Sequence, residues 1–298
     1  MRRELPDPVA LRRAIYDGEI FLGAPTPASL ELVATVRAAL ADALACELDA
    51  IRDVPQQIPN PELFARIGAL RKELYLAPKF HAAVREVIAA CGIDPGRVAF
   101  DPLRLRVIQH RGHDNPLAAA VYHPHRDTWY AHPRALIAWW IPLDDLASEE
   151  TFVFYPEKFA APVPNDSEIF DYRDWVRDGW ELKIGWQKLA AEAAYPRAAP
   201  GASGGEAVGF ACRAGENLVF SGAQFHATLP QATGRTRYSL DFRIVDLDDH
   251  AAGLGAPDVD NRSRGSALGD YVQPAQGLQE LPTGHATTLQ QLKSSQST

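Results

Sequence analysis

The spacing of apolar residues divides the chain into a helical first third and a strand-rich middle. From Ser29 to about Ala50, apolar side chains recur every three or four residues, at Leu30, Val33, Val36, Leu40 and Leu44. This period predicts an amphipathic helix with Ser29 as its N-cap. Before it, the residues from Tyr16 to Leu22 predict a first short strand, and two prolines then interrupt the chain.

Two further helices are predicted from their start and stop signals. Asn-Pro-Glu at 60–62 combines a capping residue, a proline at the first helical position and an acid in the first turn. This helix is expected to extend to about Leu76. A third helix begins near Pro78 and stops at Gly92, where glycine favours a left-handed end. Because no linker follows, we expect these helices to buttress a sheet within the same domain.

From Val98 the apolar period changes to two, which is typical of a strand with one polar face. Apolar residues and arginines alternate in the order Leu103, Arg104, Leu105, Arg106 and Val107. Gln109 falls in step with the leucines. Since either face of such a strand can turn toward a site, Arg106 and Gln109 are alternative contacts of a cofactor or substrate.

A candidate metal site begins at His125 and Asp127. In an extended segment, side chains two positions apart leave the same face and can converge on one point. An apolar strand is predicted next, from Ala135 to Leu143, and His226 follows another strand-like run 99 residues after Asp127 (226 − 127). Two imidazoles and one carboxylate hold Fe(II) and leave coordination positions open. A His-x-Asp triplet also arises by chance, but this one is the sole instance in the sequence.

Three arginines follow His226 in a segment that alternates like a strand. Arg235, Arg237 and Arg243 are separated by even numbers of residues, so all three are expected on one strand face. A planar guanidinium can hold a carboxylate group through two parallel hydrogen bonds. From the residues alone, the three arginines compete for the role of binding a dicarboxylate.

These motifs resemble a known family. HRDTW, the apolar strand with Trp140, and GENLVF followed by a histidine and R-x-S resemble the phytanoyl-CoA dioxygenase-like branch of the Fe(II)/2-oxoglutarate oxygenases, over about residues 98–245. The resemblance implies a mainly β fold with α additions, namely a double-stranded β-helix (jelly roll, cupin-like) barrel buttressed by N-terminal helices. It implies that the Fe(II) ligands are His125, Asp127 and His226. It also selects Arg237 and Thr228 to hold 2-oxoglutarate, with Trp140 beside it.

The resemblance further implies a dioxygenase that uses O2 to hydroxylate an unactivated C–H bond of a small-molecule metabolite, releasing succinate and CO2. A carboxylate at Asp127 favours hydroxylation or desaturation, since related halogenases carry a small residue at this position. Two alternatives remain: a cupin-like metal-binding protein, and a metal-dependent oxygenase or isomerase that does not use 2-oxoglutarate. Zinc is the alternative metal, although the chain has no HExxH motif and zinc leaves Arg237 unexplained.

We predict one oxygenase domain over residues 1–298. Its predicted parts are a helical buttress at 28–92, a barrel core at about 98–245, a lid-like insertion at 151–200 and a polar tail at 246–298. The insertion is expected to contain a helix from Asp171 to Leu189. Residues 201–205 match G-x-S-x-G, but a strand rather than a helix is predicted after them, so the pattern does not indicate a hydrolase.

The composition indicates which classes of binding partner and which cellular compartment to expect. The 298 residues include 38 acids and 30 bases with no basic block, which argues against a nucleic-acid partner. The charged N-terminus does not match a signal peptide, and the longest apolar run is too short to cross a bilayer. Three isolated cysteines indicate a reducing compartment. We expect a cytoplasmic protein with a small-molecule substrate and no membrane partner, and the sequence does not indicate its oligomeric state.

Near the predicted metal site, several side chains are candidates for a substrate pocket. The aromatic candidates are Trp129, Tyr130, Phe152 and Tyr155, and the candidates for binding an anionic group are Arg104, Arg106 and Arg134. This set favours a small polar metabolite with an acidic or ring-bearing part over a long acyl chain.

Overall fold

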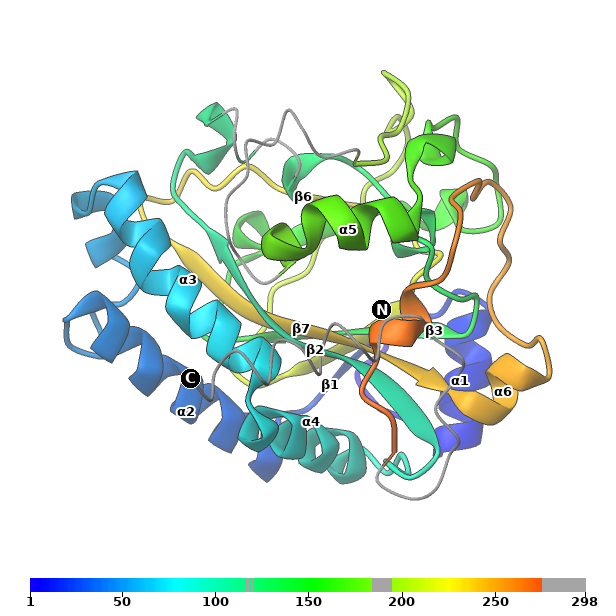
Figure 1. The fold of residues 1–298 in the computed structure, drawn as a ribbon, viewed down its shortest axis with the longest axis horizontal. Coiled ribbons are helices and arrows are strands. Elements are labelled where there is room, and N and C mark those ends of the chain that lie inside the picture. The colour runs from blue at the N-terminus through cyan, green and yellow to red at the C-terminus, as the bar shows by residue number, and fades with distance from the viewer. Residues whose placement is uncertain (116–117, 119–120, 184–194, 275–298) are drawn as a thin grey trace.

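The computed structural model describes residues 1–115, 118, 121–183 and 195–274. They form a five-stranded antiparallel sheet in the order β1-β5-β3-β7-β2 and a separate two-stranded sheet, β4-β6. The strands are β1 (Phe21–Gly23), β2 (Val98–Ile108), β3 (Leu136–Pro142), β4 (Phe152–Phe154), β5 (Asn217–Ser221), β6 (His226–Thr228) and β7 (Arg237–Asp246). No closed barrel is seen in this part of the chain, and the arrangement is a mixed one of antiparallel sheet and helices (Figure 1).

Helices cover one face of the larger sheet. The helices are α1 (Pro8–Tyr16), α2 (Pro27–Leu44), α3 (Asn60–Leu76), α4 (Pro78–Ala90), α5 (Tyr172–Lys183) and α6 (Leu247–Ala251). In Figure 1, α2, α3 and α4 lie together on one side of β2 and β7, whereas α5 lies on the other side, near β6. Among the described residues, no helix is both long and apolar enough to cross a membrane.

The predictions for the N-terminal helices were confirmed except at three boundaries. The helix at Asn60–Leu76 has the expected bounds, and Gly92 adopts the expected left-handed backbone with φ +82° after α4. Tyr16 ends a helix instead of starting a strand, because Asp7 caps α1. Helix α2 starts earlier than expected, since Thr26 is its N-cap and Ser29 completes a reciprocal capping box. It also ends at Leu44 rather than near Ala50.

Strand β7 separates the core from the site. On one of its faces the residues are apolar or aromatic and fully buried: Tyr238, Leu240, Phe242 and Ile244. On the other face the residues are Arg237, Ser239 and Arg243, which are buried, and Asp241, which is partly buried. A strand with polar side chains at alternate buried positions must place them against partners or a ligand, because an unpaired buried charge is costly. This face of β7 is therefore the place to look for a functional site.

The arginine face of β2 lies on the same side as this polar face. In the register of the two strands, Arg104 is opposite Asp241 and Arg106 is opposite Ser239, after a bulge between Asp101 and Arg104. The leucines of β2 are buried on the opposite side, where α3 packs against this strand. Of the two alternatives predicted for this strand, the arginine face is the one that turns toward the site.

The C-terminal segment, predicted as a polar tail, packs against the core over its described residues. After α6, residues 267–270 form a short 3₁₀ helix, and Phe100 and Val272 exchange two backbone hydrogen bonds of 3.1 and 2.7 Å. Leu268 and Tyr271 are buried in the main core. The polar composition of this segment concealed a few apolar anchors spaced along it. Residues 275–298 lie outside the described part, as do 184–194 in the expected helix of the insertion.

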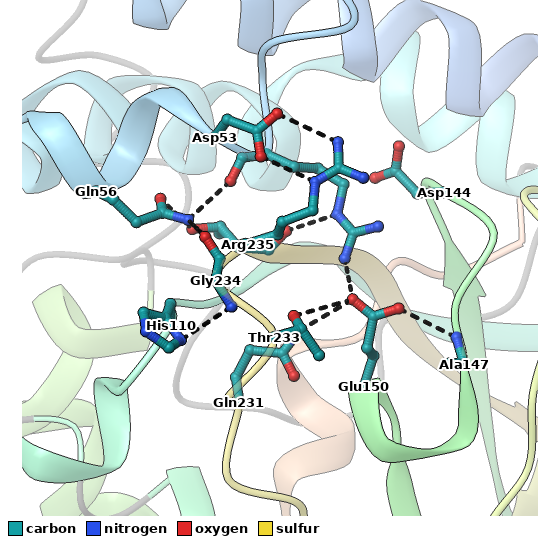
Figure 2. A network of polar contacts seen from close by, with 12 residues as sticks. Asp53, Gln56, His110, Asp144, Ala147, Glu150, Gln231, Thr233, Gly234 and Arg235 are labelled. Carbon is teal, nitrogen blue, oxygen red and sulfur yellow. Dashed lines mark hydrogen bonds and ion pairs between the residues drawn. The ribbon is translucent and has the colours of Figure 1, made fainter.

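A polar network secures the segment that leads into β7 (Figure 2). Arg52 is buried and forms an ion pair with Glu150. Its Nε donates to the carbonyl of Thr236, and the amide of Thr236 donates to the carbonyl of Arg52. Beside it, Arg235 forms an ion pair with Asp53 on the surface. The network joins the turn after α2 to the start of β7, and so restrains the residue that follows, Arg237.

Replacing Arg52 with methionine tests this restraint. The substitution leaves Glu150 largely buried without its cation, which is expected to lower the free energy of unfolding by about 3 kcal/mol. Chemical denaturation measures the change. Arg2→Met is the control, because Arg2 forms an exposed ion pair with Glu19 and its loss is expected to cost less than about 1 kcal/mol. Equal effects of the two substitutions would contradict the proposed restraint.

Candidate metal centre

His125, Asp127 and His226 meet at one point. One potential ligand atom from each lies within 4.8 Å of the others. The backbone brings the histidines together, since the amide of His125 donates to the carbonyl of His226 at 3.0 Å and the reverse hydrogen bond measures 3.1 Å. Their ring centroids are 4.4 Å apart. The prediction that the strand-like runs bring these distant side chains together is confirmed by this geometry.

Backbone carbonyls orient both imidazoles. Nδ1 of His125 lies 2.8 Å from the carbonyl oxygen of His123, and Nδ1 of His226 lies 3.0 Å from that of Gln224. A carbonyl oxygen only accepts, so each Nδ1 must carry the hydrogen. Each Nε2 therefore keeps a lone pair, which is the arrangement that outer hydrogen bonds impose on metal-binding histidines.

Asp127 is buried beside a cation. Its Oδ1 accepts a hydrogen bond of 3.0 Å from Nη2 of Arg243. Close packing holds its backbone, because a Cβ at Gly222 would lie 2.4 Å from Leu136 and 3.4 Å from the Cβ of Asp127. Glycine at 222 thus permits β5 to end against the residue that carries the carboxylate.

Burial and neighbouring charge set the protonation of the three groups. Burial, with a contribution from nearby His226, lowers the pKa of His125 to about 3, and burial also lowers the pKa of His226. Burial alone would raise the pKa of Asp127, but the Arg243 guanidinium acts with the two histidines to outweigh it, so that this pKa lies well below its usual value. At neutral pH the cluster presents two neutral imidazoles and a carboxylate, the forms that bind metal.

The three side chains line a cavity of about 290 Å³. Of the other predicted contacts, the cavity wall includes Arg106, Trp140, Thr228 and Arg237. The indole of Trp140 faces Phe152 edge-on, with ring centroids 5.4 Å apart, whereas the Trp139 indole donates to Asn217 and stacks on Phe242. The two adjacent tryptophans thus differ: the Trp140 ring packs beside Phe152 at the cavity, and the Trp139 indole is engaged within the core.

Arg237 differs from the other two arginines that competed with it. It is 3% exposed, its Nε and Nη1 have no hydrogen-bond partner, and its Cζ lies 5.9 Å from the centre of the Trp140 ring. Burial lowers its pKa to about 10, so that it stays charged at neutral pH. Arg235 is exposed and paired with Asp53, and Arg243 is engaged by Asp127. Arg243 also lines the cavity, but both of its Nη groups are paired with carboxylates and only its Nε lacks a partner, whereas Arg237 has no carboxylate partner among the described residues.

Several predicted contacts do not reach the cavity. Gln109 donates to Asn60 at 3.5 Å near the surface, because β2 ends at Ile108. Trp129 is fully buried elsewhere and donates to Asp260. Tyr155 packs on Phe225, and Arg134 donates to the carbonyl of Ala256. These residues lie close to the site in sequence, but the 3₁₀ turn after Asp127 and the short β4 direct them away from it.

Sequence reasoning missed the acids of the cavity wall. Asp241 accepts hydrogen bonds of 2.7 and 2.9 Å from Arg106, and Asp101 accepts from both Arg104 and Arg243. A usable signal was present, since charged residues stand at every second position around Ser239 on a strand that is otherwise apolar. Arg104 and Arg106 are therefore neutralised by protein acids, and neither is a free anion-binding group.

Aromatic rings form a row from the metal cluster along one wall. Successive ring contacts, with centroids 5.2 to 5.8 Å apart, connect His125, Tyr130, Phe170, Trp175 and Tyr195. All five line the cavity, and the last three belong to the insertion between β4 and β5. The insertion thus contributes an apolar wall to the cavity.

Arg126 lies between His125 and Asp127 in the sequence and anchors the loop that carries them. It is 1% exposed and donates to Asp260 at 3.0 Å and to the carbonyls of Phe159, Lys158, Ala161 and Ala223. Asp260 also accepts hydrogen bonds from Trp129 and from the backbone of Val163. A residue of the C-terminal segment therefore fixes the loop that carries His125 and Asp127.

Neither a protein-family model nor a curated protein matches the chain. Among solved structures, AviO1 from Streptomyces viridochromogenes Tue57 is 15% identical, with 85% of this chain and 99% of that chain covered and a TM-score of 0.41. The epimerase SnoN, in complex with Fe3+, alpha ketoglutarate and nogalamycin RO, is 18% identical, with 91% and 97% covered and a TM-score of 0.41. The alpha ketoglutarate dependent carbocyclase SnoK is 14% identical, with 90% and 92% covered and a TM-score of 0.40. Similarity at this level does not identify the function of this chain. The function is therefore inferred from the geometry of the site.

Asp260→Ala tests the anchoring of the metal loop. The substitution leaves the buried Arg126 charge unpaired and is expected to lower the free energy of unfolding by about 3–5 kcal/mol. Denaturant titration measures it. Asp258→Ala, two residues away and exposed, is the control and is expected to change stability by less than about 0.5 kcal/mol. A tolerant Asp260→Ala protein would refute the anchoring role.

Proposed function

We propose that this chain is an Fe(II)- and 2-oxoglutarate-dependent dioxygenase that hydroxylates a small molecule. One observation carries the proposal: the same cavity contains the cluster of His125, Asp127 and His226 and the buried, unpartnered guanidinium of Arg237. We further propose that the two sheets form a double-stranded β-helix within a single domain, with residues 151–200 as a lid-like insertion. The five-stranded and two-stranded sheets on either side of the cavity support this part.

The donor set fits a ferrous ion. His125, Asp127 and His226 supply three ligands of the kinds that non-haem Fe(II) oxygenases use on one face of the metal. Three protein ligands leave other coordination positions to small molecules. Zinc would be satisfied by the same residues and one water, but would give no reason for a buried guanidinium without a partner in the same cavity.

The free guanidinium fits a dicarboxylate cosubstrate. A buried cation whose donors lack partners is costly unless a ligand satisfies them, and a carboxylate matches the planar fork of arginine. Arg237 would hold the far carboxylate of 2-oxoglutarate, with the Thr228 hydroxyl on β6 as a second donor and the Trp140 ring as a flat neighbour. In this role the fixed end of the cosubstrate directs its other end toward the histidines.

The protein residues would position and shield the reactants. Fe(II) and 2-oxoglutarate, when bound, would supply the activation of O2: 2-oxoglutarate would be oxidised to succinate and CO2, with one oxygen atom passing to succinate and the other to the substrate. The chain contributes orientation and the exclusion of water. The buried ring of Phe152, 5.8 Å from that of His226, keeps one side of the cluster apolar. A carboxylate ligand at Asp127 favours hydroxylation over halogenation.

The aromatic row points to a ring-bearing substrate. Tyr130, Phe170, Trp175 and Tyr195 offer ring faces and edges along the wall that starts at His125. Aromatic pairs gain about 0.5–1.5 kcal/mol from geometry beyond the burial of area. The arginines predicted to meet an acidic group, Arg104 and Arg106, are paired with Asp101 and Asp241. A ring therefore suits the wall better than an acidic group does.

Arg237→Met tests the cosubstrate role. Succinate formation is measured with Fe(II), 2-oxoglutarate and O2 in the absence of substrate. The substitution is expected to raise the 2-oxoglutarate concentration needed for half-maximal turnover at least about tenfold, because it removes a charge-assisted bidentate contact, while metal binding is retained. Arg235→Met is the matched control and is expected to behave as the parent protein. Asp127→Ala is expected to abolish turnover.

The outcomes separate the alternatives. An inert parent protein that still binds iron would favour a cupin-like binding protein or an enzyme that does not use 2-oxoglutarate. If Arg235→Met raised the 2-oxoglutarate requirement and Arg237→Met did not, the assignment of the carboxylate contact would be wrong.

Trp175→Ala tests the substrate wall. Calorimetry compares two uncharged probes of similar size, 3-phenylpropanamide and octanamide, on the protein loaded with Co(II) and 2-oxoglutarate. The substitution is expected to weaken binding of the ring-bearing probe by up to about tenfold, and Trp175→Phe to restore most of it. Stronger binding of octanamide by the parent protein would contradict a ring-bearing substrate.

A further inference from the structure

Among the arginines of the described cavity wall, Arg243 is the one that forms an ion pair with a candidate metal ligand, Asp127. We propose that it is a positioning residue, which engages one oxygen of Asp127 and so limits this carboxylate to a single metal–oxygen contact. The inference rests on the proposed function, because it assigns a task to a residue that would not itself touch iron or 2-oxoglutarate.

The two prongs of this guanidinium hold two different carboxylates. Nη2 donates to Oδ1 of Asp127 at 3.0 Å, and Nη1 donates to Oδ2 of Asp101 at 3.0 Å. Arg243 is 8% exposed, and Asp101 and Asp127 are 1% and 4% exposed. Because both prongs are engaged away from bulk water, the guanidinium has little freedom to turn.

Asp101 is itself held in place. It lies directly opposite Arg243 in the register of β2 and β7, and Nη2 of Arg104 approaches its carboxylate at 2.8 Å. On the other side of Arg243, the register of β3 places the small residue Ala138. The bulge after Asp101 is what brings Arg104 onto the same face, and the resulting chain of charges runs from Arg104 through Asp101 and Arg243 to Asp127.

This chain of charges has a consequence for coordination. With Oδ1 committed to Arg243, Asp127 offers Oδ2 to a metal. A carboxylate bound through one oxygen, together with two imidazoles, fills three positions of a six-coordinate ion and leaves three. A chelating cosubstrate needs two of these and O2 needs one, whereas a carboxylate bound through both oxygens would leave only two positions in all.

Arg243 and Arg237 therefore have different proposed roles on the same face of β7: Arg243 positions Asp127, and Arg237 binds the dicarboxylate. They are six residues apart on β7 (243 − 237) and point into the same cavity. Arg243 has carboxylate partners within the protein, while Nε and Nη1 of Arg237 have no partner. Loss of Arg243 should change metal coordination, and loss of Arg237 should change only the affinity for the dicarboxylate.

Co(II) is a suitable probe, because its visible absorption reports coordination number without turnover. Wild type, Arg243→Gln and Arg243→Lys are titrated with Co(II), and then with 2-oxoglutarate. We expect Arg243→Gln to weaken Co(II) binding about 10–100-fold, the range found for outer-shell partners of metal ligands, and to change the absorption of the bound Co(II). Arg243→Lys, which keeps the charge, is expected to recover part of the affinity.

Matched variants separate positioning from general damage. Arg52→Gln removes another buried, ion-paired arginine outside the cavity and is expected to leave Co(II) affinity and absorption unchanged. Asp101→Asn loosens Arg243 without altering it and is expected to shift both readouts in the same direction as Arg243→Gln, by less. This variant also carries the test if Arg243→Gln does not fold.

The failures are distinguishable. Folded Arg243→Gln and Asp101→Asn proteins with wild-type Co(II) affinity and absorption would overturn the positioning role and leave the proposed function intact. A wild-type protein that binds neither Co(II) nor 2-oxoglutarate would instead overturn the proposed function. An effect of Arg52→Gln on Co(II) as large as that of Arg243→Gln would also overturn the positioning role.

Discussion

The structure depends on the pair of backbone hydrogen bonds that joins His125 to His226. Without this bridge the two imidazoles would have no reason to be near each other, since 101 residues separate them (226 − 125). The bridge also aligns the turn after Asp127 with the end of β5, where Gly222 allows close approach. One short stretch of sheet pairing thus brings the candidate metal ligands together.

The cost of burying charge explains much of the wall around that cluster. Arg104, Arg106 and Arg243 are each paired with an aspartate of the same strand, of a neighbouring strand or of a loop, because an ion pair inside a protein offsets the loss of hydration only when its geometry is good. Arg237 breaks this rule. The contrast between Arg237 and the paired arginines of the cavity supports the proposed anion-binding role more strongly than the presence of an arginine alone.

The sequence was sufficient for features that depend on local spacing. The i, i+2 placement of His125 and Asp127, the helix start at Asn60 and the even spacing of the arginines on β7 follow from backbone periodicity, which is a property of neighbouring residues. The assignment of Arg243 to Asp127 does not follow from spacing, because it depends on the register of β2 with β7 and on a bulge that no local pattern marks. For the same reason, nothing near Trp129 indicated that its indole would turn away from the site.

The link between Arg126 and Asp260 shows why the polar C-terminal segment belongs to the site. Arg126 stands between two candidate ligands. Its buried guanidinium donates to several backbone carbonyls, and Asp260 is the carboxylate that pairs with its charge. Since those carbonyls belong to the segment after β4 and to the turn before His226, one arginine ties together three regions that are remote in sequence. A polar composition therefore does not mark this segment as dispensable, because Asp260, whose side chain is 6% exposed, holds the backbone from which His125 and Asp127 project.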